Sequence, residues 1–414
     1  MIKLFNYLLI SSIFTGGFVF NNGHFDFYLS YIFMAGFLLA CVFFYRKIDI
    51  PRKFLYILTA VFFLSLINVF QGNNSLPALL KVMIGFLLNG VTYYLLIRLN
   101  DNKVDGLFRI YIQIACAVAL IGIFQEISYL VGFKGGYDYR FFIPRTVRPS
   151  TQYGILRVIS IMQEPAHLGA AMAPALFVSI LNIIQGTKYF INKKMSWLII
   201  ACVLLSFSLV SYLGIIAVFV LIMFNYKRVK MIVVCTLIPV ILIFTAYKTL
   251  PEIRLRIDDT IAVISGKKPL DRHVTLSVFV VCRNGFVAYQ SFRNNPLFGS
   301  GLGSHPLSYG RYISPETDPE IIMPTLNKED ASGLFLRILS ETGLLGVFLF
   351  FYFIFRFYVS RKKQSHFWVI SNAIICLVIL NLLRQGNYFY NGFIFFIWLY
   401  YFTYKNAEAK ETPV

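Results

Sequence analysis

The chain is dominated by a succession of apolar runs, and most of them have the length of one membrane-spanning helix. A bilayer core about 30 Å thick requires about 20 mostly apolar residues per helix. The stretch at 196–226 is too long for one span and predicts two short helices that meet near Ser206, Phe207 and Ser208. Each other run predicts one helix: 4–20, 26–45, 54–71, 78–98, 106–131, 166–185, 231–249, 336–358, 367–384 and 391–404. The pattern predicts an all-α polytopic membrane protein, a single integral membrane domain with about 12 transmembrane helices.

Basic residues concentrate in alternate connecting loops. Sixteen Lys and Arg residues fall in one set of short loops: 46–53, 98–109, 186–195, 225–230 and 359–364. The opposite set, at 21–25, 72–77, 206–211 and 384–390, holds only Arg384. Because Lys and Arg are enriched in cytoplasmic loops, this asymmetry places both termini in the cytoplasm. Two long loops, 132–165 and 250–335, are then predicted on the outer face.

Composition agrees with this assignment and narrows the function classes. The chain of 414 residues is 58% hydrophobic and 14% charged, whereas a soluble domain carries about 25% charged residues. These values exclude a cytosolic enzyme, a disordered chain and a disulfide-rich secreted module. The net charge of +19 suggests cytoplasmic anchoring first and an anionic ligand second. Five of the six cysteines lie inside apolar runs and no CxxC pair occurs, so they are interpreted as packing residues.

The first long loop, 132–165, is basic and aromatic. It carries a net charge of +3, although outer loops are normally depleted of Lys and Arg. Guanidinium groups bind phosphate oxygens in a bidentate geometry, and aromatic rings stack against sugar rings. The loop therefore predicts a site for an anionic ligand, with a basic patch against lipid headgroups as the alternative. Its basic residues are Lys134, Arg140, Arg145, Arg148 and Arg157.

The second long loop, 250–335, contains a stretch in which every charged residue is arginine. These residues are Arg272, Arg283, Arg293 and Arg311. If 272–293 is helical, Arg272 and Arg283 lie on one stripe about 16 Å apart, too far to hold one phosphate together. One could hold a pyrophosphate while the other holds a second substrate. The segment is otherwise apolar, and a purely structural helix at the membrane surface is the alternative.

Two further motifs follow this helix. The turn at 295–303 contains Gly299, Gly301 and Gly303, which allow the backbone to turn sharply and approach a ligand closely. Arg337 and Glu341 are four residues apart on a predicted helix and can pair along one face. Such a pair is either a structural contact or part of a site.

Three features of the chain resemble the Wzy-type O-antigen polymerase and O-antigen ligase superfamily, GT-C-like glycosyltransferases of the bacterial inner membrane. The first is the segment from Arg157 to Gly169, with its Glu164-Pro165 pair at the entry to a predicted span. The second is the serine-rich break between two short spans. The third is the order of Arg283, the glycine-rich turn, a long outer loop and the Glu341-Thr-Gly segment.

The resemblance implies lipopolysaccharide biosynthesis: a growing glycan moves from undecaprenyl pyrophosphate to an acceptor hydroxyl on the periplasmic face. No metal, other cofactor or nucleic acid is expected, and a chain-length regulator protein joins membrane lipid among the implied partners. Arg157 and Arg283 are expected to neutralise the pyrophosphate, with His305 and Glu341 as further catalytic residues. The expected substrate-binding residues are Arg140, Arg145, Arg148, Glu164, His167, Arg272, Arg293, Gly299, Gly301 and Ser332.

Polymerase is the preferred function, and the general base is left open. Ligases tend to have His-Asn where this chain has Ser332-Gly333, which weakens the ligase alternative of transfer to lipid A core. The candidate bases are Glu164, His167, His305, Asp330 and Glu341. An alternative of another class is a flippase or transporter of lipid-linked oligosaccharide. A flippase requires cationic residues deep in the spans, whereas these arginines lie in outer loops.

Overall fold

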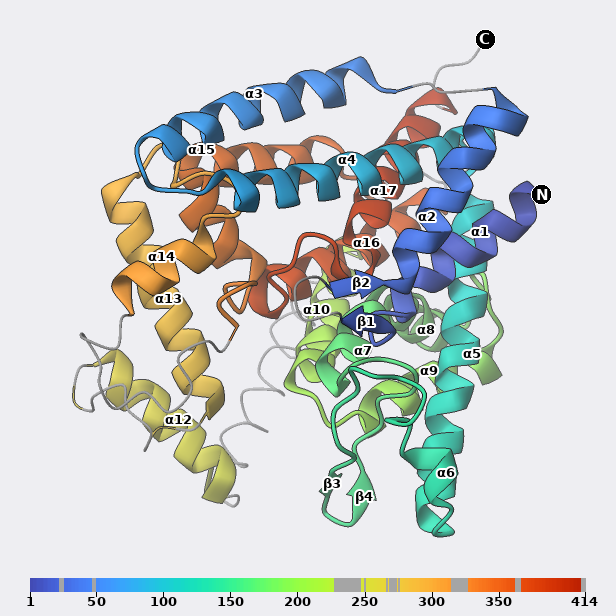
Figure 1. Ribbon diagram of the computed structural model, residues 1–414. Coiled ribbons are helices and arrows are strands. Elements are labelled where there is room, and N and C mark those ends of the chain that lie inside the picture. Colours follow the sequence, from blue (N-terminus) through green and yellow to red (C-terminus); the bar gives the residue numbers. More distant parts are fainter. Residues whose placement is uncertain are drawn as a thin grey trace.

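The computed structural model is built almost entirely of helices (Figure 1). It describes residues 1–21, 26–46, 50–226, 247–248, 251–265, 267, 274, 276–313, 327–361 and 366–410. Within these ranges the strands form two small antiparallel hairpins: β1 (Val19–Asn21) with β2 (Asp26–Tyr28), and β3 (Thr151–Gln152) with β4 (Ile155–Leu156). The predicted all-α class is confirmed.

Five of the described helices are long and apolar enough to cross a membrane. They are α3 (Arg52–Phe70), α4 (Leu76–Leu99), α5 (Val104–Leu130), α15 (Leu334–Arg356) and α16 (Phe367–Arg384). A bent pair, α7 (Pro165–Ala171) and α8 (Ala173–Gln185), makes a sixth candidate if it is one span, with 61° between its helices. Several long apolar helices are the expected feature of a membrane-embedded protein.

The other apolar runs form helices that are too short to count as candidate spans by length. They are α1 (Ile2–Ser11) with η1 (Ser12–Phe14), α2 (Leu29–Ala40) with the π-helical turn η2 (Cys41–Tyr45), α9 (Lys193–Leu205), α10 (Leu209–Asn225) and α17 (Phe393–Ala409). The run at 231–249 lies almost wholly outside the described residues. Length and composition therefore identify five or six spans in the described part of the chain, and the number of twelve stays a prediction.

Local sequence explains where the helices stop. After η1 the chain reaches Gly16 and Gly17, which favour helix termination, and it turns into β1. The run at 166–185 was expected as one helix, but Pro174 lies in the first turn of α8, where a missing N–H and a fixed φ favour a new helix start. The predicted break between α9 and α10 is confirmed, with Phe207 at a φ of 43°.

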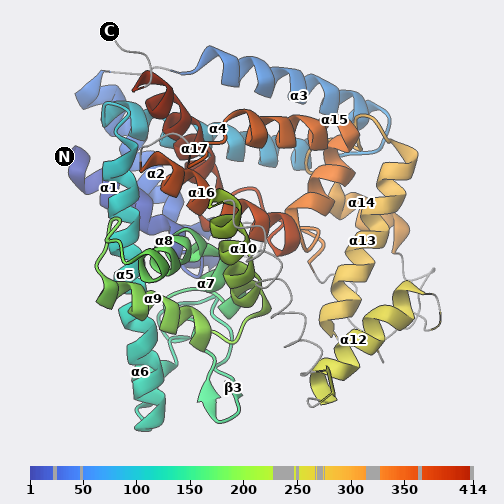
Figure 2. The same cartoon turned by 180° about the vertical axis from the view of Figure 1, so that it is seen from behind.

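Helix α16 lies at the centre of the packing, and α3 lies at its edge. About 72% of the apolar window of α16 is buried, against α8, α10, α15 and α17. Only 11% of the corresponding window of α3 is buried, and Ile57 and Phe70 are 65% and 84% exposed. Figures 1 and 2 show α3 on the periphery. A continuous exposed apolar helix is unfavourable in water, whereas hydrocarbon tails solvate it in a bilayer.

Polar contacts tie together the loops of the lysine- and arginine-rich set. Asn6 and Asn100 exchange side-chain hydrogen bonds of 2.8 and 2.9 Å. The Asn406 side chain of α17 donates to the carbonyl of Asn102 at 2.7 Å. Elsewhere, the Arg361 guanidinium lies 3.6 Å from the centre of the Tyr226 ring, and His366 Nε2 lies 2.7 Å from Asp105 Oδ2. The start of α1, the end of α17 and the α4–α5 turn therefore meet at one end of the fold.

A second group of contacts joins the loops of the opposite set. The α3–α4 turn meets the segment after α13, because Asn74 donates to the Leu302 carbonyl at 2.8 Å. Tyr28 of β2 shares a hydrogen bond of 2.9 Å with Tyr390 of η3 (Tyr390–Gly392). Asp26 forms an ion pair with Arg145 of the first long loop. These contacts connect segments that lie in, or directly beside, loops that the charge pattern assigns to the outer face.

The long loops carry additional short helices. The first contains α6 (Lys134–Tyr137), and the second contains α12 (Pro251–Ile264), α13 (Leu276–Asn294) and α14 (His305–Tyr312). Both views show α12, α13 and α14 on the flank away from α5 and α6 (Figures 1 and 2). Helix α13 packs against α14 and α15, and it corresponds to the helix predicted over 272–293.

Candidate functional site

Helix α15 is interrupted at Gly343, whose backbone has a φ of 61° and a ψ of −158°. The glycine-rich turn after α13 inserts its backbone at this break. The N–H of Leu344 donates to the carbonyl of Pro296, and the N–H of Gly301 donates to the carbonyl of Glu341, both at 2.9 Å. Further bonds join Leu345 to Leu297 (3.1 Å) and Ser300 to Ser340 (3.0 Å). The turn therefore satisfies backbone groups that the break would leave unpaired.

Close backbone contact explains the glycines of this turn. Gly299 and Gly301 have φ values of 67° and 92°, in the left-handed region that favours glycine. A Cβ on Gly343 would lie 2.6 Å from the Gly299 nitrogen, and a Cβ on Gly301 would lie 3.0 Å from Asn74 Nδ2. These contacts hold the turn against α15 and against the α3–α4 connection. Substrate contact at Gly299 and Gly301 stays a prediction.

Glu341 is a buried partner in a structural network. Its side chain is 0% exposed, and Oε1 accepts a hydrogen bond from Arg337 Nε at 3.0 Å. Oε2 accepts from the Tyr388 hydroxyl at 2.9 Å, and the Arg337 guanidinium lies 4.4 Å from the centre of the Tyr388 ring. Arg337 also donates to the carbonyl of Gly386 at 3.2 Å. The contacts of Arg337, Glu341 and Tyr388 join α15 to the segment after α16. Both carboxylate oxygens of Glu341 accept hydrogen bonds.

His305 is buried in a second polar chain. Its Nδ1 lies 3.0 Å from Ser340 Oγ and its Nε2 lies 3.1 Å from Asn284 Oδ1. Asn284 in turn donates to Ser332 Oγ at 3.0 Å. Burial lowers the pKa of His305 to about 3, and the Arg337 charge acts in the same direction. In a neutral imidazole Nε2–H donates to Asn284, and Nδ1 shares the Ser340 hydroxyl proton with the Arg337 carbonyl, which lies 3.1 Å from Ser340 Oγ.

The two arginines assigned to the pyrophosphate occupy different environments. Arg283 of α13 is 2% exposed, with its guanidinium 4.7 Å from the centre of the Phe279 ring. Arg157 follows β4, and its backbone N–H donates to Ser150 at 2.9 Å. Arg157 Nε is buried and has no hydrogen-bond partner among the residues described. No described contact joins these two guanidinium groups.

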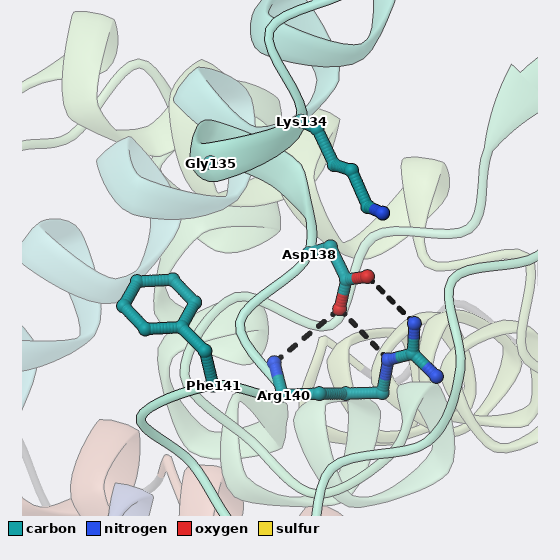
Figure 3. Close-up of a pocket in the computed structure, with 5 residues that line it drawn as sticks. All are labelled: Lys134, Gly135, Asp138, Arg140 and Phe141. Atoms are coloured by element: carbon teal, nitrogen blue, oxygen red, sulfur yellow. Dashed lines mark hydrogen bonds and ion pairs between the residues drawn. The ribbon is translucent and has the colours of Figure 1, made fainter.

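Arg140 is held by a neighbouring acid at the end of the first long loop's short helix. Its Nε and Nη2 donate to the two oxygens of Asp138 at 2.9 and 2.7 Å, as Figure 3 shows. These hydrogen bonds lower the pKa of Asp138. Lys134 and Phe141 line the same shallow pocket (Figure 3). The Arg140–Asp138 pair is neutral overall, so Lys134 supplies the net positive charge of the residues that line this pocket.

Arg145 and His167 approach each other from the loop and from α7. The pair of Arg145 with Asp26 lies close to the Tyr28–Tyr390 hydrogen bond, and the Arg145 charge acts on both tyrosines. The His167 ring lies 5.4 Å from the Tyr390 ring, and its Nε2 lies 3.4 Å from Glu164 Oε1. Glu164 is the residue before α7, so its carboxylate also faces the positive end of that helix.

Asp330 and Arg384 complete this arrangement. Asp330 lies in the turn before α15, and its carboxylate interacts electrostatically with His167, Arg337 and Arg384. Arg384 ends α16, and its Nη1 is buried without a partner in the described part of the chain. We call the following set the outer polar cluster: Asp26, Tyr28, Arg145, Glu164, His167, Asp330, Arg384 and Tyr390. It brings six segments of the chain together.

The predicted site residues therefore divide into groups. Glu341, His305 and Ser332 belong to connected buried networks, and Arg145, Glu164 and His167 belong to the outer polar cluster. Arg148 and Arg293 are exposed. Arg272 lies outside the described residues. The expected roles of these residues stay predictions.

Several members of the outer polar cluster were not predicted as site residues. Asp26, Tyr28 and Tyr390 lie in or beside short connections that carry no recognisable motif. The available signal was Arg384, the one basic residue in the short outer loops. Arg384 departs from the general lack of basic residues in the short outer loops, and it is a member of the cluster.

Comparison with known proteins adds no relative to this description. No protein-family model matches the chain, and no curated protein matches it significantly. What the chain does must therefore be argued from its own residues.

Proposed function

We propose that this chain is a bacterial inner-membrane polysaccharide polymerase that joins undecaprenyl-pyrophosphate-linked repeat units on the periplasmic face. The observation that carries the proposal is the buried Nε–H of Arg157, which has no hydrogen-bond partner among the described residues and lies in a loop that the charge pattern assigns to the outer face. A buried N–H without a partner costs about 1–3 kcal/mol, and a phosphate oxygen would supply the missing acceptor.

The proposed topology has about 12 spans, with both termini in the cytoplasm. The grouping of the loops supports this assignment. Contacts near Asn100 and Tyr226 connect loops of the basic set, whereas contacts near Asn74, Arg145 and Tyr390 connect loops of the other set. The short loops at one end of the fold are rich in Lys and Arg, and those at the other end are poor in them. This agrees with the usual distribution of Lys and Arg across a bilayer.

In the proposed reaction, Arg157 stabilises the negative charge that develops on the leaving diphosphate. A preorganised cation at a developing anion lowers the transition-state free energy more than it stabilises the ground state. Arg283 is proposed as the second guanidinium. Because its side chain is 2% exposed, its participation requires the donor to separate α13 from its neighbours.

The proposal is tested with full-length protein in lipid nanodiscs and polyprenyl-pyrophosphate-linked repeat units extracted from the host's own membranes. A polymerase yields a ladder of glycan lengths without any added acceptor. The ladder is expected to persist in EDTA, because the proposed leaving-group stabilisation uses guanidinium groups.

The alternatives give different results in the ladder assay and in a transport assay with the protein in lipid vesicles. Addition of a single glycan block, only when lipid A core is supplied, identifies a ligase. Movement of the lipid-linked repeat unit across a vesicle bilayer without a new glycosidic bond identifies a flippase. Either result overturns the polymerase proposal.

A further inference from the structure

The structure separates the five candidate bases by how many of their acceptor atoms are occupied. Glu341 and His305 are 0% exposed, and each uses both of its polar side-chain atoms in hydrogen bonds. Glu164 and His167 face each other at 3.4 Å. Asp330 differs from Glu341 and His305, because Oδ1 accepts the Ser332 N–H at 3.0 Å and Oδ2 accepts no hydrogen bond from a described residue.

The backbone around Asp330 is held firmly against the outer end of α16. A Cβ added to Gly386 would collide with the Asp330 carbonyl oxygen. A Cβ on Gly333 would lie 3.1 Å from the carbonyl oxygens of both Leu382 and Leu383. The turn before α15 is therefore in direct contact with the end of α16, and Ser332 orients one carboxylate oxygen of Asp330 from within that turn.

Ionisable groups from three helices interact with the Asp330 carboxylate. Arg337 of α15, His167 of α7 and Arg384 of α16 interact with it electrostatically, and it acts in turn on Tyr390 of η3. Burial raises the pKa of Asp330, although the Ser332 N–H and these cations oppose the shift. A carboxylate with a raised pKa is a stronger base while it is still ionised at neutral pH.

Unsatisfied polar atoms gather at the same end of the fold. Asn381 lies one turn before Arg384 on α16 and is 0% exposed, yet neither of its amide atoms has a described partner. Nδ2 of Asn391, in η3, and Nη1 of Arg384 are also buried without a described partner. Native proteins rarely leave such atoms unpaired, and a polar ligand would supply the missing partners of these four atoms. A sugar, with its several hydroxyl groups, is a suitable polar ligand.

We infer that Asp330 is the general base of the glycan transfer and that Arg384, Asn381 and Asn391 hold the acceptor sugar beside it. This inference rests on the proposed polymerase function. Asp330 takes the proton of the acceptor hydroxyl while that oxygen bonds to the anomeric carbon of the donor glycan. The anomeric C–O bond to the diphosphate breaks, and its electron pair leaves with the diphosphate. The proton then passes from Asp330 to water.

The test compares Asp330→Asn, Asp330→Ala and Asp330→Glu with wild type in the nanodisc ladder assay. Loss of a general base lowers rates by about 10²–10⁴-fold, and we expect Asp330→Asn and Asp330→Ala to fall in that range. Asp330→Glu should retain activity and the acidic limb of the pH–rate profile. Formate should partly restore the Asp330→Ala variant, because a small carboxylate can replace the missing base.

Glu329 provides the matched control in the same turn. Its side chain is 63% exposed and lies 3.8 Å from Lys81, so Glu329→Gln should leave the rate and pH profile unchanged. Size-exclusion profiles and thermal unfolding establish that each variant is folded.

The outcomes distinguish the inference from the function on which it rests. A wild-type ladder with a normal rate for Asp330→Asn overturns the assignment of the base alone. An Asp330→Ala variant that is folded, inactive and insensitive to formate also overturns it, because that pattern indicates a structural role. A wild-type protein that forms no ladder refutes the polymerase proposal itself.

Discussion

At the scale of single residues, burial and pairing decide which charged groups remain able to meet a substrate. Arg140 and Arg145 are each paired with a nearby acid, at Asp138 and Asp26. Arg157 instead has a buried N–H without a described partner. Sequence alone could not rank these three arginines, because all lie in the same basic loop.

We predict that Arg157→Ala abolishes polymer formation while the protein still inserts in the membrane. Removing one preorganised donor to a developing anion typically lowers the rate by about 10²–10³-fold. The measurement is the initial rate of ladder formation. Lys134→Ala removes a positive charge from the same loop and should be near wild type, and Arg140→Ala should lose less activity than Arg157→Ala. Near-normal chain length in Arg157→Ala would refute the assigned role.

A second prediction concerns His305 and acid stability. Its folded-state pKa of about 3 lies below the ordinary value near 6.5, so the unfolded chain binds more protons between these values. The stability due to neutral His305 is complete above about pH 6.5 and falls progressively as the pH is lowered toward about 3. Thermal unfolding at a series of pH values measures this effect.

His305→Gln is the comparison for the pH series. Glutamine keeps hydrogen-bonding capacity but does not titrate, so its unfolding temperature should depend less on pH in this window. An unchanged slope would show that other groups account for the acid sensitivity.

At the scale of elements, breaks in the helices create the contacts that position the site. The bend between α7 and α8 places His167 near η3, and the break in α15 receives the glycine-rich turn. The serine-rich break between α9 and α10 was predicted correctly because three polar residues interrupt one apolar run. The break at Gly343 was not predicted, since a single glycine inside an apolar run is compatible with a continuous helix.

We predict that Gly343→Ala destabilises the protein. Its φ and ψ lie in a region that is almost restricted to glycine and costs other residues about 1–3 kcal/mol, and the new methyl group would press on the Gly299 nitrogen. The unfolding temperature should fall. Gly310 of α14 is the control, because a Cβ there meets nothing within 4 Å. Gly310→Ala should be neutral or slightly stabilising, and equal effects at both positions would contradict this account.

At the scale of the whole molecule, the described loops sort into two groups that match the charge pattern. Each polar contact discussed between these loops joins two members of one group. The outer polar cluster belongs to the group whose short loops hold one basic residue, Arg384. A reaction at that cluster therefore takes place on the outer face if the charge rule is obeyed.

Membrane-impermeant maleimide labelling tests this arrangement. Tyr153 in the β3–β4 hairpin is 69% exposed, and the Lys103 side chain at the opposite end is 76% exposed. With the native cysteines replaced, intact spheroplasts should label Tyr153→Cys, and Lys103→Cys only after permeabilisation. Labelling of Lys103→Cys but not Tyr153→Cys in intact cells would reverse the orientation and remove the periplasmic assignment.

The sequence by itself determined the helical class, most helix positions and the two sets of loops. These properties depend on local composition. A run of apolar residues favours a helix, and a cluster of basic residues favours one side of the membrane, whatever the rest of the chain contains. Only the tertiary structure decided which polar groups meet. His305 and Glu341 are enclosed by partners, whereas Asp330, Arg384 and Asn381 come together from residues up to 54 positions apart. Such neighbours arise from helix packing, and no local pattern encodes them.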